Sequence, residues 1–74
     1  MNKKNQHVVP HPKGWAVKSE GNPTPTSVHR TQANAISEAQ KAAQKGKSEL
    51  FIHNREGQIR ERNSYGNDPH PPKG

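Results

Sequence analysis

The sequence predicts an α+β domain of ββαββ order, in which an antiparallel sheet of two hairpins carries one helix on one face. Three observations predict this fold. Short runs of β-forming residues flank a Pro-Lys-Gly break near the N-terminus. An alanine-rich stretch with apolar residues at helical spacing follows. A second pair of β-forming runs, joined by a short polar segment with a glycine, comes after it.

The first hairpin is predicted over residues 6–10 and 15–19. Its first strand should end at Pro10, because proline cannot donate a hydrogen bond to a neighbouring strand. In the second strand, side chains alternate between the two faces of the sheet. We expect this alternation to place the Trp15 side chain in the core, where it would not stack on a ligand. Lys18 should then project from the opposite face of the sheet.

The helix is predicted from Gln32 to Gln44 or Lys45, with Val28 giving a short extended segment before it. Thr31 is expected to be the N-cap, because its hydroxyl can accept a hydrogen bond from the first turn. Gly46 is expected to follow the helix as its C′ residue. A narrow apolar stripe should face the sheet, formed by Ala35, Ile36, Ala39 and Ala43.

The second hairpin is predicted over residues 49–53 and 58–62, joined by residues 54–57. Gly57 suits this connection because glycine adopts positive φ angles readily. We expect Ile59 to face inward on the return strand.

The predicted domain covers residues 6–62, after a disordered N-terminus over residues 1–5. An irregular tail rich in proline and glycine is predicted over residues 63–74, with Tyr65 packing near the core. Only 24% of the residues are hydrophobic, which predicts a thin core and favours dimerisation.

Several classes of function lack support in the sequence. The absence of cysteine excludes disulfides and thiolate metal sites. No segment reads as a membrane span or a signal peptide, so we predict a cytoplasmic protein with no membrane partner. The histidines are scattered and no nucleophile motif is present, so we predict no metal, no cofactor and no enzymatic activity.

The formal net charge of +6 on 74 residues predicts an anionic partner. Alternation along the strands places a basic set with one aromatic ring on the face opposite the helix. This set comprises Lys18, Phe51, His53, Arg60 and Arg62. Such a face can stack a base on the ring while cations meet phosphates. Arg60 and Arg62 are expected roughly 7 Å apart on this face.

Two other roles fit the same residues. The set also fits a solvated sheet face, or a dimer interface centred on Phe51.

The leading hypothesis is a weakly sequence-specific protein that binds DNA or RNA. The alternative is a protein–protein interaction module, or a small homodimeric adaptor with an acidic partner. If the sheet face does not bind, the next candidate is the cluster at the helix end, Lys41, Lys45 and Lys47.

Six segments carry a resemblance to a known family: HVVP, GWAVK, the helix opening TQ-x-x-A-I, ELFIH, GQIR and the ending NSYG…PPKG. From His7 onward, the chain resembles the small bacterial proteins of domain-of-unknown-function family 2188. The resemblance implies a small self-contained domain. It implies no activity, cofactor or binding site, so the functional hypotheses rest on the residues themselves.

Overall fold

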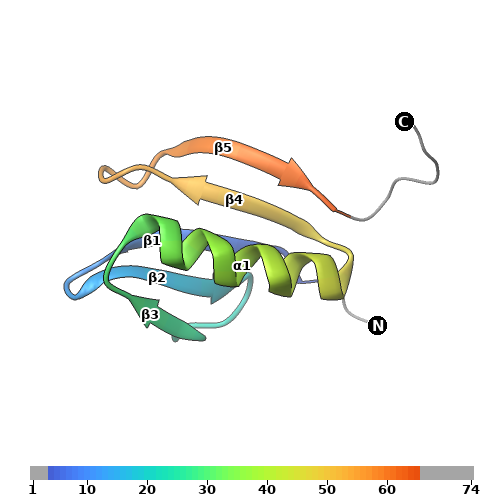
Figure 1. Cartoon of the computed structure of the whole chain (residues 1–74), viewed down its shortest axis with the longest axis horizontal. Coiled ribbons are helices and arrows are strands. Elements are labelled where there is room, and N and C mark those ends of the chain that lie inside the picture. The colour runs from blue at the N-terminus through green and yellow to red at the C-terminus, as the bar shows by residue number, and fades with distance from the viewer. Residues whose placement is uncertain (1–3, 66–74) are drawn as a thin grey trace.

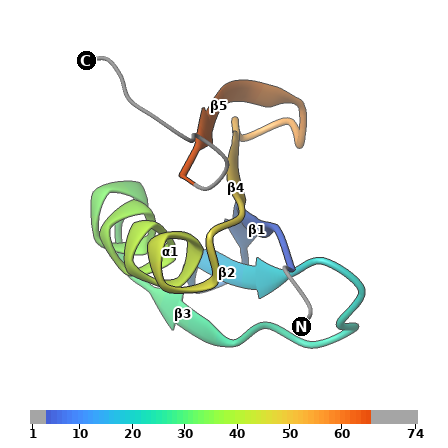
Figure 2. The same ribbon diagram turned by 90° about the vertical axis from the view of Figure 1, so that its right-hand side faces the viewer.

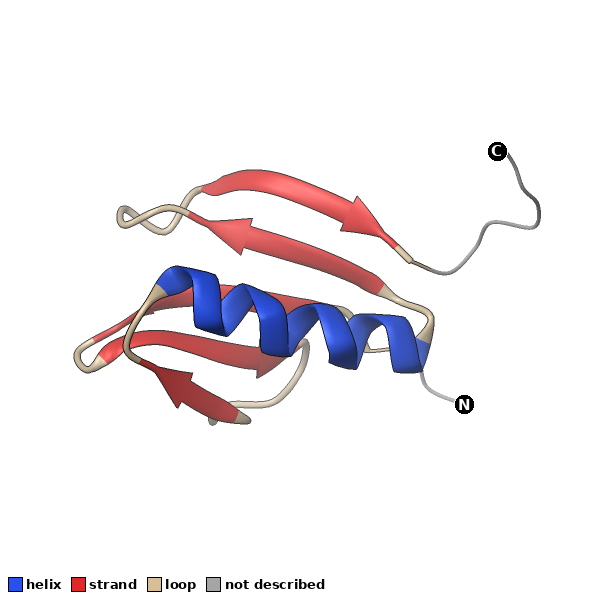
Figure 3. Cartoon of the chain, viewed as in Figure 1, coloured by secondary structure: helices blue, strands red, loops and turns tan. Residues whose placement is uncertain are grey.

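The computed structural model describes residues 4–65. Within these residues, five strands and one helix follow each other as β1 Gln6–His11, β2 Gly14–Ser19, β3 Ser27–His29, α1 Gln32–Gly46, β4 Glu49–His53 and β5 Ile59–Ser64 (Figures 1 and 3). The α+β class, the helix and the two hairpins are confirmed. The short strand β3, which precedes the helix, is added to the predicted ββαββ order.

The strands form a mixed sheet in the order β3-β2-β1-β4-β5. The two hairpins are antiparallel, but β1 and β4 pair in parallel, with Gln6 opposite Leu50 and Val8 opposite Ile52. The prediction of a wholly antiparallel sheet is therefore wrong at its centre. Strand β3 is antiparallel to β2 and so points the same way as β1 and β4. Helix α1 is thus a crossover between parallel strands, which need a long connection.

The core lies between α1 and one face of the sheet (Figure 2). Ala35, Ala39 and Ala43 stand four residues apart on one stripe of the helix and are fully buried. Because alanine ends at Cβ, the helix can pack close to the strands. The apolar side chains that face it from the sheet are Val8, Trp15, Val17, Leu50 and Ile52. The predicted alanine stripe and the core position of Trp15 are confirmed.

Both ends of α1 are capped. Thr31 has extended backbone angles, and its hydroxyl accepts a hydrogen bond from the Asn34 amide at 3.1 Å, as predicted for an N-cap. At the other end, the prediction for Gly46 is wrong by one residue. Gly46 is the last helical residue, and Lys47 takes the left-handed conformation with φ 52°. The Ser48 amide then donates to the Ala43 carbonyl at 2.9 Å, which closes a Schellman motif.

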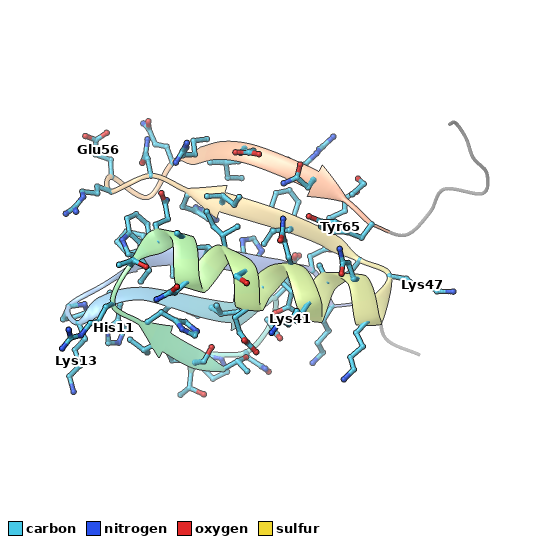
Figure 4. The ribbon with its side chains drawn as sticks, viewed as in Figure 1. His11, Lys13, Lys41, Lys47, Glu56 and Tyr65 are labelled. Atoms are coloured by element: carbon cyan, nitrogen blue, oxygen red, sulfur yellow. The ribbon has the colours of Figure 1, made fainter. Side chains whose placement is uncertain are left out.

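The ordered domain extends slightly beyond the predicted limits. Asn5 lies in the segment expected to be disordered, yet its carbonyl accepts from the Glu20 amide at 2.8 Å and its side chain from the Glu49 amide at 3.0 Å. Strand β5 runs to Ser64 rather than to residue 62. Tyr65 then packs against the core, as predicted (Figure 4). The rest of the predicted tail, residues 66–74, lies outside the described residues.

The close packing of α1 predicts that a larger side chain at its centre destabilises the domain. Ala39→Leu should lower the free energy of unfolding by about 1–3 kcal/mol, because the buried site has no room for the added carbons. Urea denaturation measures this change. Ala33→Leu places the same side chain at an exposed helical position and should leave stability nearly unchanged. Equal stability of the two variants would contradict the close contact.

Candidate functional site

We call the sheet face turned away from α1 the open face. Since Val8, Val17 and Ile52 point toward the helix, alternation turns their chain neighbours to the open face. The predicted residues Lys18, Phe51, His53 and Arg62 lie on this face, together with His7, Val9 and Ala16. Four of the five predicted site residues therefore share one surface.

Four open-face residues stand side by side across the sheet. His7 lies opposite Lys18 of β2 and opposite Phe51 of β4, and Phe51 lies opposite Arg62 of β5. We call Lys18, His7, Phe51 and Arg62 the cross-strand row. The His7 and Phe51 rings are stacked, with centroids 5.0 Å apart and planes 24° apart. Neighbouring strands are about 4.8 Å apart, so the row spans roughly 14 Å with a cation at each end.

Arg60 does not lie on the open face, so this part of the site prediction is wrong. The pairing of β4 with β5 shifts between Ile52 and His53, and Arg60 is the extra residue of the bulge. Its guanidinium turns to the helix side and donates to the Gln32 side chain at 3.0 Å. The same shift places Ile59 opposite His53, where it is 55% exposed rather than facing inward.

A chain of hydrogen bonds crosses the open face through two histidines. His53 Nδ1 lies 3.0 Å from the Gly57 carbonyl oxygen, and His53 Nε2 lies 3.0 Å from His7 Nδ1. His7 Nε2 lies 3.2 Å from a Glu20 carboxylate oxygen. Sequence reasoning missed His7 and Glu20 as site residues, because the parallel pairing that brings His7 beside His53 leaves no local signal in the sequence.

This chain of bonds constrains which ring nitrogens donate. A carbonyl only accepts, so His53 Nδ1 must donate to Gly57. A carboxylate also only accepts, so His7 Nε2 must donate to Glu20. With both rings neutral, two nitrogen lone pairs would face each other across 3.0 Å. The contact between the rings is a hydrogen bond only where one of these two facing nitrogens carries a proton.

The Glu20 carboxylate responds to its hydrogen-bond partners. The hydrogen bond from His7, and to a lesser extent one from Asn5, lowers the pKa of Glu20 below its ordinary value of 4.5. A carboxyl group whose pKa is lowered by folding adds stability above its unfolded pKa. That contribution is lost as the pH falls through the lowered folded value. This contribution therefore depends on the hydrogen bonds that favour the ionised form of Glu20.

The described residues contain no grouped metal ligands and no membrane-spanning helix. Over residues 4–65, no three His, Asp or Glu side chains are grouped so that they could hold a metal ion. His7 and His11 both belong to β1, and their separation along an extended strand keeps the side chains roughly 13 Å apart. The helix in this part of the chain is neither long enough nor apolar enough to cross a membrane.

The hydrogen bond to His7 can be tested through Glu20. His7→Phe removes the donor while keeping a ring on the open face, so the pKa of Glu20 should rise toward its ordinary value. NMR titration of the Glu20 carboxyl carbon measures this change. His11→Phe is the matched control, because His11 belongs to the same strand and contacts the Lys13 amide instead. If the titration midpoint of Glu20 is unchanged in His7→Phe, the hydrogen bond between His7 and Glu20 is refuted.

Comparison with known proteins places the chain in a family. Residues 6–65 match the family described as an uncharacterized protein conserved in bacteria, domain-of-unknown-function family 2188. The chain is also 37% identical over 59 residues to "Uncharacterized protein YdaT" of Bacillus subtilis (strain 168), a match that covers 80% of this chain and 39% of that relative. The chain thus spans well under half of the length of this curated relative. No solved structure is a significant match. Because the family match runs from the first residue of β1 to Tyr65, just after β5, the chain belongs to domain-of-unknown-function family 2188.

Proposed function

We propose that the protein binds nucleic acid on its open face, without catalysis and with weak sequence preference. The cross-strand row is the observation that carries this proposal. The His7 and Phe51 rings are stacked on each other, so each ring keeps its other face for a base, and every base has a face that can stack. Lys18 and Arg62 flank the rings and can meet phosphates on either side. This arrangement favours single strands, whose bases are free to stack.

The charge of the open face also supports an anionic partner. Within residues 4–65, neither Lys18 nor Arg62 has a carboxylate oxygen within 4.0 Å of its charged nitrogens. Phosphate contacts carry no sequence information, so binding should depend strongly on salt and weakly on sequence.

A homodimer or an acidic protein partner has less support. The large apolar residues most exposed in the described chain are Val28, at 39%, and Ile59, at 55%. They belong to β3 and β5, which are the two outer strands of the sheet. This separation places them on opposite edges rather than around Phe51, where a dimer interface would need a shared apolar centre. Sedimentation at several concentrations tests this alternative, which a concentration-dependent mass would favour.

Removal of the Phe51 ring should weaken binding to single strands. Phe51→Ala should cost about 1–3 kcal/mol of binding free energy through lost stacking, with little change in salt dependence. Fluorescence anisotropy with labelled single-stranded and double-stranded DNA and RNA measures this effect. Phe51→Trp keeps an aromatic surface and should retain binding. Val28→Ala removes exposed apolar area at the sheet edge and is the matched control. Full affinity in Phe51→Ala would contradict a stacking role.

Removal of the flanking cations should act through salt dependence instead. Each lost phosphate contact reduces the slope of log K against log salt by about 0.7 for single strands. The double variant Lys18→Gln/Arg62→Gln should therefore lower the slope by about 1.4 and weaken all sequences alike. The control is Lys41→Gln/Lys47→Gln, which removes equal charge from α1 and the residue that follows it (Figure 4). A larger loss of affinity and salt dependence in this control would indicate that the binding surface lies at the end of the helix instead.

A further inference from the structure

A second basic site lies at one end of the molecule, apart from the cross-strand row. Three arginines line a groove of about 610 Å³: Arg30 before α1, Arg55 in the β4–β5 turn, and Arg60 in the bulge of β5. We call this the arginine groove, and its other lining residues are Trp15, Thr31, Gln32 and Asn54. The β4–β5 turn and the start of α1 lie at the same end of the fold as the β1–β2 turn (Figure 1).

The segment that carries Arg30 is fixed against the sheet. Gly14 has φ 134°, and a Cβ atom there would lie 2.2 Å from the His29 carbonyl oxygen and 2.9 Å from that of Arg30. Only glycine permits this approach of two backbones. The start of β2 therefore holds the backbone of Arg30 in place beside Trp15.

The other two arginines are held by side-chain contacts. Gln32 donates to the His53 carbonyl at 3.0 Å and accepts from the Arg60 guanidinium at 3.0 Å. Gln32 thus links the helix, β4 and the bulge of β5. The Arg55 guanidinium lies over the Trp15 ring, 6.0 Å from its centroid, within the range of a cation–π contact. These contacts direct both guanidinium groups to the same groove before any ligand is present.

The charge of the groove is not balanced by acidic side chains. No aspartate or glutamate is among its lining residues. Within the described part of the chain, none of the three guanidinium groups has a carboxylate within 4.0 Å. Three like charges gathered in one groove repel each other, and a bound anion would relieve this repulsion.

We propose that the arginine groove binds a phosphate group with a free terminus, such as a phosphate monoester or pyrophosphate. A guanidinium presents paired N–H donors in a fixed plane that matches two phosphate oxygens. A terminal phosphate has three outer oxygens and up to two negative charges, enough to engage all three arginines. A single carboxylate has two oxygens and one charge. None of the groove residues belongs to the cross-strand row, so this site does not depend on nucleic-acid binding at the open face.

Titration of the full chain with pyrophosphate at low salt tests the site. Calorimetry should show saturable binding, and the fluorescence of Trp15, the single tryptophan, should change with the same dissociation constant. Arg30→Gln and Arg60→Gln should each weaken binding by about tenfold or more, because each removes charge-assisted hydrogen bonds. Both side chains are exposed, so the core is unaffected. Lys47→Gln, at the opposite end of α1, is the matched control and should bind as the unmodified chain does.

The same experiment can distinguish two sources of the phosphate group. Tighter binding of a 5′-phosphorylated oligonucleotide than of its 5′-hydroxyl form, lost in Arg30→Gln, would support a nucleic-acid end as ligand. Equal binding of the two forms, with pyrophosphate still saturable, would support a free phosphate compound. Absence of saturable pyrophosphate binding, or equal losses in Arg30→Gln and Lys47→Gln, would overturn the site. Phe51→Ala should leave pyrophosphate binding intact, so failure of the open-face proposal would not be mistaken for failure of this one.

Discussion

The parallel pairing of β1 with β4 is the constraint on which the other features of this protein depend. It joins two hairpins that would each be marginal alone and gives them a common core. Parallel strands need a crossover, and α1 supplies it on the face where Ala35, Ala39 and Ala43 allow close packing. The same pairing sets His7 beside Phe51 and within hydrogen-bonding distance of His53. Residues 46 positions apart in the chain thereby become one surface.

Because the core is small, most charged and polar side chains of this chain lie at the surface. The fold gathers many of them into two sites. The open face gathers the stacked rings of His7 and Phe51, the contact between His7 and His53, and the flanking cations Lys18 and Arg62. The end of the molecule where α1 begins gathers three guanidinium groups. The bulge in β5 divides the two sets, because it turns Arg60 to the helix side and leaves Arg62 on the open face. One irregular residue thus decides on which surface each arginine lies.

The features that the sequence predicts correctly are those with local causes. Thr31 as N-cap, the alanine stripe of the helix and the alternation along β2 and β4 follow from residues close in the chain. The features that the sequence did not predict depend on residues far apart in the chain, or on small differences in energy between neighbouring conformations. The β1–β4 register depends on the whole core, and the bulge depends on how one turn meets its neighbour strand. The helix end moved by one residue because Lys47 accepts the left-handed conformation that was expected of Gly46.

The nucleic-acid binding that we propose depends on the parallel pairing, which assembles the cross-strand row. The most direct measurement is an NMR titration of the labelled protein with an unlabelled single-stranded oligonucleotide. We expect the signals of Lys18, His7, Phe51 and Arg62 to shift together and to fit one dissociation constant, although these residues come from four different strands. Shifts confined to the lysines at the end of α1, or no shifts at low salt, would contradict the proposal.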